Sequence, residues 1–149
     1  MKAEILKVLR ESSGHVSGQE LCERFQVSRT AIWKVISQLK EEGYEIEAVR
    51  NKGYRLQESP DVLSKEEMES RIETRTIGKR VEYYAETDST NIRAKQAAGQ
   101  GAVHGTLFVA DRQSAGKGRR GRSWDSPEGT EIFMSLLLRP QFAPDKAPM

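Results

Sequence analysis

Residues 17–43 read SGQELCERFQVSRTAIWKVISQLKEEG, and this stretch decides the fold of the first part of the chain. Ser17 stands three residues before Glu20, which is the spacing of a capping box and predicts a helix start. Ser28 is a second N-cap, and Gly43 suits the left-handed residue that follows a helix. Two helices joined by a short turn predict a helix-turn-helix. The apolar stripe of the second helix consists of Ile32, Ile36 and Leu39.

The segments on either side of this stretch extend the prediction to a winged helix. Ile5, Leu6 and Leu9 lie at helical spacing and predict a first helix that ends near residues 12–14. Residues 44–49 and 54–56 alternate as strands do, around a turn-like segment at 50–53. The result is a β-hairpin with basic residues at its tip, which is the wing.

The exposed face of the second helix of the motif is a candidate DNA-reading surface. Such a helix can enter the major groove, whereas basic wing residues contact phosphate or the minor groove. One alternative is a helical module that docks another protein. Trp33 can either face DNA or pack under the wing. The candidate DNA-binding residues are Arg29, Thr30, Trp33, Lys34, Arg50 and Lys52.

Composition indicates a globular protein with no strong overall charge. The chain has 149 residues, of which 36% are hydrophobic and 31% charged, and its net charge is +2. Residues 1–56 carry 10 Lys/Arg and 8 Asp/Glu, and the remainder carries 14 of each, so any DNA-binding charge is local. The lone Cys22 excludes an internal disulfide and a zinc site. With no apolar run of membrane-spanning length and no signal peptide, we expect a cytoplasmic protein without membrane association.

A polar, proline-containing joint at residues 57–61 predicts two domains, 1–58 and 61–149. A second capping-box pattern at residues 64–67 predicts a short amphipathic helix there. Beyond it, the pattern indicates a strand at 81–85 and a helix at 92–98 capped by Asp88 or Ser89. Strands at 106–110 and 132–138 follow, the latter apolar enough to be buried, and 141–149 reads as a loop.

Residues 116–122, GKGRRGR, hold four cations and three glycines. Like charges repel and glycines lose backbone entropy on ordering, so the loop makes sense if an anion completes it. We expect it to be loose when empty and ordered when occupied. No helix pattern follows, which excludes a Rossmann turn, and no Lys-Ser/Thr pair follows the last glycine, which excludes a Walker A loop. A basic surface loop for nonspecific nucleic-acid binding is the alternative.

These motifs together resemble the biotin–protein ligase family, including its bifunctional members that repress biotin genes. The resemblance rests on the winged helix, Asp88-Ser89-Thr90-Asn91, Gln113, the basic loop and Trp124. It implies an α+β chain: a winged helix-turn-helix followed by the first part of a mixed α/β, class II synthetase-like catalytic domain. It also implies biotin and ATP as substrates, Mg²⁺ with unknown ligands, and a biotinyl-AMP intermediate.

The resemblance further implies roles for individual residues and partners. Arg119 and Lys117 are the implied catalytic residues, and Lys117 stands where many relatives have arginine. The partners are the biotin carboxyl carrier protein and operator DNA, with a homodimer when biotinyl-AMP is bound. Biotin binding is implied for Ser89, Thr90, Asn91, Gln113, Lys117, Gly118 and Arg119, and adenylate binding for Arg120, Arg122 and Trp124, with Trp124 against adenine.

Relatives of this kind continue through a Lys-Trp-Pro-Asn-Asp-like motif and a small C-terminal β-domain, neither of which occurs in these 149 residues. We therefore expect the chain to be a fragment or a truncated product that does not turn over alone. The alternative function is a non-catalytic regulator of the winged-helix class that senses the same ligand. The co-occurrence of Gln113, Arg119 and Trp124 favours the ligase, because a protein that only binds DNA has no need of them.

Overall fold

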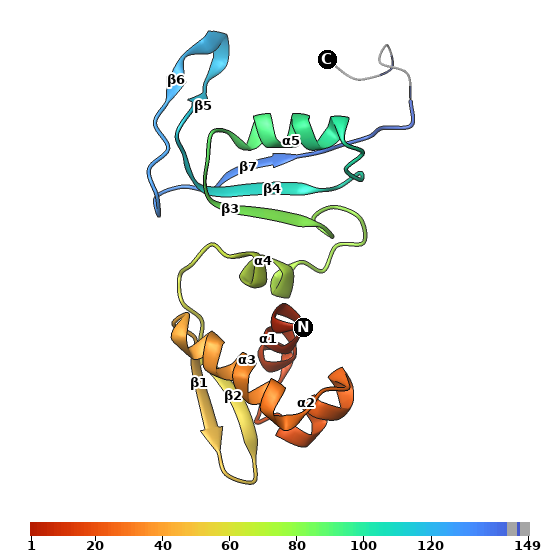
Figure 1. Ribbon diagram of the computed structural model, residues 1–149, viewed down its shortest axis with the longest axis vertical. Helices are drawn as coiled ribbons and strands as arrows, with labels where there is room; N and C mark the ends of the chain where they lie inside the picture. The colour runs from red at the N-terminus through yellow and green to blue at the C-terminus, as the bar shows by residue number, and fades with distance from the viewer. Residues whose placement is uncertain (143–145, 147–149) are drawn as a thin grey trace. The chain divides into compact units, whose positions relative to one another are not determined.

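The computed structural model describes residues 1–142 and 146, and two compact units are distinguished, Met1–Arg71 and Ile72–Met149 (Figure 1). Of the loop predicted at 141–149, residues 143–145 and 147–149 lie outside this description. The units divide after the short helix at Lys65–Arg71, not at the polar joint. The functional limits 1–58 and 61–149 stay predictions.

Three helices and a two-stranded hairpin form most of the first unit, with a fourth helix at its end. The elements are α1 (Lys2–Glu11), α2 (Gly18–Phe25), α3 (Arg29–Glu41), β1 (Glu45–Val49), β2 (Gly53–Glu58) and α4 (Lys65–Arg71). The predicted caps are confirmed: the hydroxyl of Ser17 accepts the Glu20 amide at 3.0 Å, and that of Ser28 accepts the Ala31 amide at 3.2 Å. Gly43 is left-handed, with φ of 94°.

The helical core of the first unit fixes the hairpin to the helices. Its fully buried side chains include Ile5, Leu6, Leu9, Leu21, Ile32 and Leu39. The hairpin joins this core through Tyr54, whose amide and carbonyl bond the carbonyl and amide of Val16 at 2.9 and 2.8 Å. Gly53, with φ of 113°, permits this approach, because a Cβ there would lie 2.0 Å from the Val16 oxygen.

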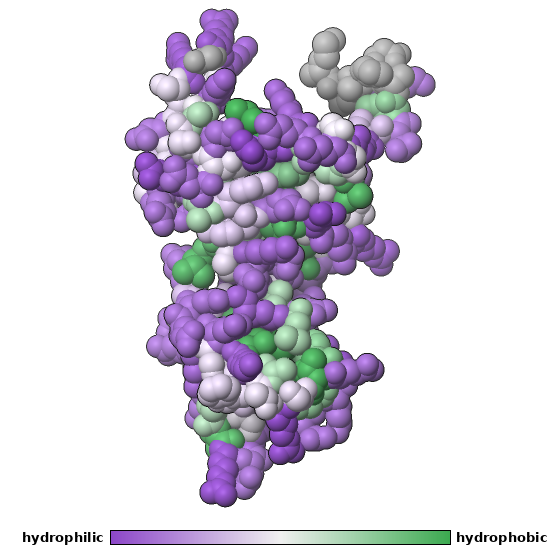
Figure 2. All heavy atoms as spheres, in the orientation of Figure 1, coloured by the Kyte–Doolittle hydropathy of each residue, from purple (hydrophilic) through white to green (hydrophobic). Residues whose placement is uncertain are grey.

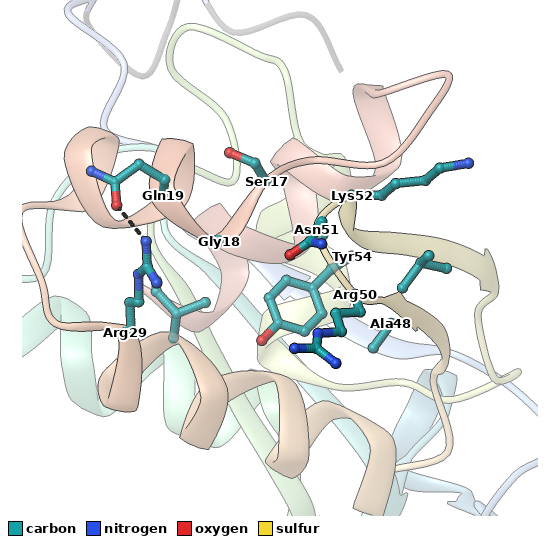
Figure 3. A pocket seen from close by; sticks show the side chains of 12 residues that line it. Ser17, Gly18, Gln19, Arg29, Ala48, Arg50, Asn51, Lys52 and Tyr54 are labelled. Carbon is teal, nitrogen blue, oxygen red and sulfur yellow. Dashed lines mark hydrogen bonds between the residues drawn. The ribbon is translucent and has the colours of Figure 1, made fainter.

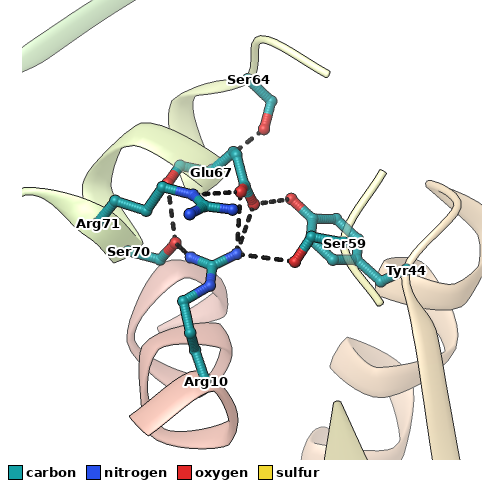
Figure 4. A network of polar contacts seen from close by, with 7 residues as sticks. All are labelled: Arg10, Tyr44, Ser59, Ser64, Glu67, Ser70 and Arg71. Carbon is teal, nitrogen blue, oxygen red and sulfur yellow. Dashed lines mark hydrogen bonds and ion pairs between the residues drawn. The ribbon is translucent and has the colours of Figure 1, made fainter. Parts of the chain in front are cut away.

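A polar network attaches α4 to the rest of the first unit (Figure 4). The buried carboxylate of Glu67 accepts from Arg10 at 2.9 Å, from the Tyr44 hydroxyl at 2.8 Å and from Arg71 at 2.6 Å. Arg10 also donates to Ser70. Burial by itself would raise the pKa of Glu67, but the hydrogen bonds from Tyr44, Arg71 and Arg10 outweigh it and lower that pKa. The carboxylate therefore stays ionised and α4 packs on α1.

The second unit is a three-stranded sheet of order β3-β4-β7 with one helix on it (Figure 1). Its elements are β3 (Val81–Thr87), α5 (Thr90–Gly99), β4 (Leu107–Gln113), β5 (Gly116–Lys117), a 3-10 turn η1 (Arg119–Gly121), β6 (Ser123–Trp124) and β7 (Phe133–Leu136). β3 and β4 are parallel and α5 connects them, while β7 runs antiparallel to β4. β5 and β6 form a separate hairpin.

The prediction of a buried strand at 132–138 is wrong in its burial. Within the described residues β7 bonds only to β4, so it lies at the edge of the sheet. Ile132 is 67% exposed and Met134 65%, whereas Phe133 between them is buried under α5. An apolar run marks a strand, but it does not determine how many neighbours the strand has.

Candidate functional site

The predicted ligand-binding residues gather at one edge of the second unit. Thr87 ends β3 and Gln113 ends β4, and these parallel strands pair Thr87 with Gln113. The carboxyl ends of parallel strands meet at one edge, where open α/β sheets bind ligands. The turn before α5 and the hairpin β5–β6 both begin at this edge.

The turn after β3 contains Asp88 and Ser89, one of which the sequence predicted to cap α5. Neither Asp88 nor Ser89 caps α5 through its side chain. Asp88 instead forms an ion pair with Arg93 at 2.5 Å and accepts the Ser89 amide at 2.6 Å. The hydrogen bond from Arg93, then that from Ser89, holds the pKa of Asp88 far below its usual range. The turn is therefore closed by an ion pair.

The free amide at the start of α5 is capped from a distant strand. Gln113 accepts the Thr90 amide through Oε1 at 2.8 Å, and the Thr90 hydroxyl approaches the same oxygen at 3.3 Å. The other side of the Gln113 amide faces Ser126, with Nε2 at 3.4 Å from the hydroxyl. Ser126 is buried. Gln113, at the end of β4, therefore fixes the start of α5, and both places were predicted to bind the same ligand.

A pocket of about 310 Å³ opens at this edge. The sequence-predicted residues that line it are Ser89, Thr90, Asn91, Gln113, Lys117 and Trp124, joined by Glu131, Ile132, Phe133, Met134 and Ser135. Gly118, Arg119, Arg120 and Arg122 are not among its lining residues. The structure thus brings together six predicted residues, and it leaves the arginines of the basic loop outside the pocket wall.

The basic loop itself is a narrow hairpin closed by the Gly118 amide on the Arg122 carbonyl at 2.7 Å. Arg120 has φ of 61°, a left-handed conformation that costs a non-glycine residue energy. Lys117, Arg119, Arg120 and Arg122 are exposed, and no ion pair to them is present among the described residues. Such a hairpin offers unneutralised positive charge beside the pocket.

Two serines of the site were missed by sequence reasoning. Ser126 supports Gln113, and Ser135 on β7 lies 2.9 Å from the Thr90 hydroxyl. Ser135 pairs with Phe108 of β4, which places both on the face of the sheet that α5 covers. The sequence signal that could have revealed Ser135 was a single hydroxyl in the otherwise apolar segment 132–138.

The predicted DNA-binding residues all lie at the surface of the first unit. Arg29, Thr30, Trp33 and Lys34 are exposed along α3, and Arg50 and Lys52 are exposed at the turn between β1 and β2. A cleft of about 450 Å³ separates the wing from α2 and α3, and its lining includes Arg29, Arg50, Asn51 and Lys52 (Figure 3). Arg29 donates to Gln19 at 3.0 Å across the start of α2.

Trp33 does not pack under the wing, because it is 60% exposed. Tyr54, by contrast, is partly buried against the helical core. The tip of the β1–β2 hairpin is hydrophilic in Figure 2, in keeping with Arg50, Asn51 and Lys52. An exposed aromatic between Arg29 and Lys34 can contact a thymine methyl group or a sugar while the cations contact phosphate.

Comparisons with known proteins match both units. Residues 2–55 match the HTH domain family and residues 83–149 the biotin/lipoate A/B protein ligase family. The chain is 40% identical to the bifunctional ligase/repressor BirA of Bacillus subtilis (strain 168) over 99% of its length, and 32% identical to that of Escherichia coli (strain K12) over 97%. It covers 46% and 43% of these proteins, respectively, which is less than half of each.

A solved structure, biotin protein ligase from Aquifex aeolicus in complex with biotin and ATP, is 43% identical over 42% of this chain and 25% of that chain, with a TM-score of 0.37. None of the helices within residues 1–142 has the length and apolar character needed to cross a membrane. The predicted order of a helix-turn-helix domain and a biotin ligase domain is confirmed. Residues 83–149 match the biotin/lipoate A/B protein ligase family, residues 2–55 match the HTH domain family, and the chain is similar over 99% of its length to a bifunctional ligase/repressor of which it covers 46%.

Proposed function

We propose that this chain is part of a cytoplasmic biotin–protein ligase that also represses biotin genes. The ligase forms biotinyl-AMP from biotin and ATP and transfers the biotinyl group to a lysine of the biotin carboxyl carrier protein. The observation that carries the proposal is the pocket at the end of β3 and β4, lined by polar side chains and flanked by the unneutralised hairpin β5–β6.

The first reaction needs alignment and charge neutralisation. The biotin carboxylate is already ionised, so its oxygen attacks the α-phosphorus of ATP without a general base, and the bond to pyrophosphate breaks. The carrier amine then attacks the biotinyl carbonyl, AMP leaves, and the amine loses a proton. Negative charge gathers at phosphorus in the first step, and preorganised cations and amides stabilise it. Lys117 and Arg119 are placed on the hairpin that can supply them.

The predicted residues are proposed to divide the ligand among three groups. The buried turn and Gln113 bind the polar ring of biotin, while the hairpin covers the carboxylate and phosphate. Lys117 gives charge without the two-pronged geometry of arginine, so we expect a weaker grip at that position. The ring group comprises Ser89, Thr90, Asn91 and Gln113, the carboxylate and phosphate group Lys117, Gly118 and Arg119, and the adenylate group Arg120, Arg122 and Trp124.

Mg²⁺ is proposed to accompany ATP. Within residues 1–142 no three His, Cys, Asp or Glu side chains are grouped to hold a metal ion, so we assign the ion no protein ligands. Oxygens of the ATP phosphates are ordinary ligands for this ion.

The first unit is proposed to bind operator DNA through α3 and the wing. One helix-turn-helix covers one half-site, so specific repression calls for a homodimer that forms when biotinyl-AMP is bound. The domain limits 1–58 and 61–149 describe this division of labour, with the DNA-binding part ending before the linker.

Calorimetric titration of biotinyl-AMP into the chain tests the ligand site. Arg119→Ala should weaken binding about 10- to 100-fold, the worth of a charge-assisted hydrogen bond. Arg80→Ala is the matched control, because Arg80 is exposed and pairs with Glu82 away from the hairpin. Absence of binding by the unaltered chain would refute the proposal for these residues. Transfer of radiolabelled biotin to a carrier domain, in this chain and in any longer product that contains it, tests the activity.

A further inference from the structure

Arg29 is the first residue of α3, a position where a positive side chain does not stabilise a helix. The N-terminal end of a helix carries partial positive charge, so a cation there is disfavoured. The first turn of α3 contains no acidic residue that would offset this charge. Within the described part of the chain, Arg29 is exposed and forms no ion pair. The stability of α3 therefore gives no reason for an arginine here, which favours a role in binding.

The Arg29 side chain is held by a neutral partner on the neighbouring helix (Figure 3). Its Nη2 donates to Oε1 of Gln19, near the start of α2, at 3.0 Å. The Nε2 of Gln19 donates in turn to the Glu23 carboxylate at 2.7 Å. A guanidinium only donates and a carboxylate only accepts, so these two contacts fix the orientation of the Gln19 amide. Gln19 is thus itself held in the orientation that receives Arg29.

We propose that Gln19 is a positioning residue for DNA binding, which orients the Arg29 guanidinium toward a phosphate of the duplex without neutralising it. This inference rests on the proposed DNA binding and deepens it. Gln19 and Arg29 line the same cleft, which Arg50 and Lys52 line from the wing. An amide directs the guanidinium and leaves its charge for phosphate, whereas a carboxylate in its place would form an ion pair with it. Ordering Arg29 before DNA binds reduces the entropy lost on binding.

Fluorescence titration of one duplex, selected by the unaltered chain from a randomised pool, tests this role. Gln19→Ala should weaken DNA binding about two- to tenfold, because binding must then order the Arg29 side chain. The slope of log affinity against log salt should not change, since no cation is removed. Arg29→Ala should weaken binding and also reduce the size of that slope by about 1. Gln38→Ala is the matched control, because Gln38 is an exposed glutamine of α3 that does not line the cleft.

A double-mutant cycle separates positioning from a direct contact of Gln19 with DNA. If Gln19 acts through Arg29, Gln19→Ala should change the affinity by less than about twofold when Arg29 is already alanine. An equal loss in both backgrounds would overturn the inference, as would an unchanged affinity in Gln19→Ala alone.

Gln19→Glu provides a second measurement, because it keeps an acceptor for Arg29 but adds a negative charge beside it. It should reduce the salt slope by about 1, and by more than Gln38→Glu does. Equal slopes in these two variants would contradict the inference. Failure of the unaltered chain to select any duplex would overturn the proposed DNA binding itself, and this inference with it.

Discussion

Glu67→Gln should lower the stability of the whole first unit, because it removes the one negative charge in a network that contains two arginines. The side chain of Glu67 is 9% exposed and that of Arg10 is 21% exposed, so the pair is largely shielded from water. Breaking a buried pair costs about 3–5 kcal/mol. Arg10 retains some hydration and Arg71 is 58% exposed, so we expect a loss below that range, about 2–3 kcal/mol.

Hydrogen exchange with mass spectrometry measures this loss one unit at a time. Amides of α1 and α3 should exchange faster in Glu67→Gln, while amides of β4 in the second unit provide the internal reference. The matched control is Glu69→Gln on the same helix, since Glu69 makes only a 3.8 Å contact with the exposed Lys65. If Glu67→Gln lost no more stability than Glu69→Gln, the network would not be what attaches α4 to the unit.

Three further outcomes follow from the structure. The pKa of Glu67 is lowered in the folded state, so its carboxylate stabilises the fold above the ordinary carboxyl pKa, and this stabilisation is lost as the pH falls through the folded pKa. The difference in unfolding free energy between the unaltered chain and Glu67→Gln should therefore shrink on acidification. A difference that grew would contradict this. Gly53→Ala should destabilise the first unit by several kcal/mol in urea unfolding, because φ is 113° and the new Cβ would meet a backbone oxygen at 2.0 Å, whereas Gly14→Ala, with open space around it, should be mild; equal losses would refute the strain. Lys34→Ala should lower DNA affinity and reduce the salt slope by about 1 relative to Lys7→Ala, and an unchanged slope would remove α3 from the interface.

The parts of the fold that could be predicted from the sequence are those that depend on residues close together in the chain. The caps at Ser17 and Ser28 and the left-handed Gly43 depend on residues within one helical turn, and the structure has them where the spacing indicated. The same holds for the wing, because alternation around a turn-like segment needs no distant partner. These features depend on contacts of short sequence separation.

The features of the site that join residues far apart in the chain could not be predicted from the sequence pattern. The capping of Thr90 by Gln113 joins residues 23 positions apart, and the contact with Ser135 spans 45. Both depend on which strands pair and in what register, which periodicity does not reveal. The edge position of β7 was missed for the same reason. Glu67 looked like part of a capping box, and only the packing of α4 on α1 placed it opposite Arg10.

We propose that the basic hairpin β5–β6 closes over a negatively charged biotin intermediate. Hydrogen exchange of residues 114–126, with and without saturating biotinyl-AMP, tests it most directly. Amides of β5, η1 and β6 should exchange more slowly with the ligand, and Arg119→Ala should weaken this protection. Exchange in the hairpin that did not change while biotinyl-AMP was bound elsewhere on the chain would contradict the account.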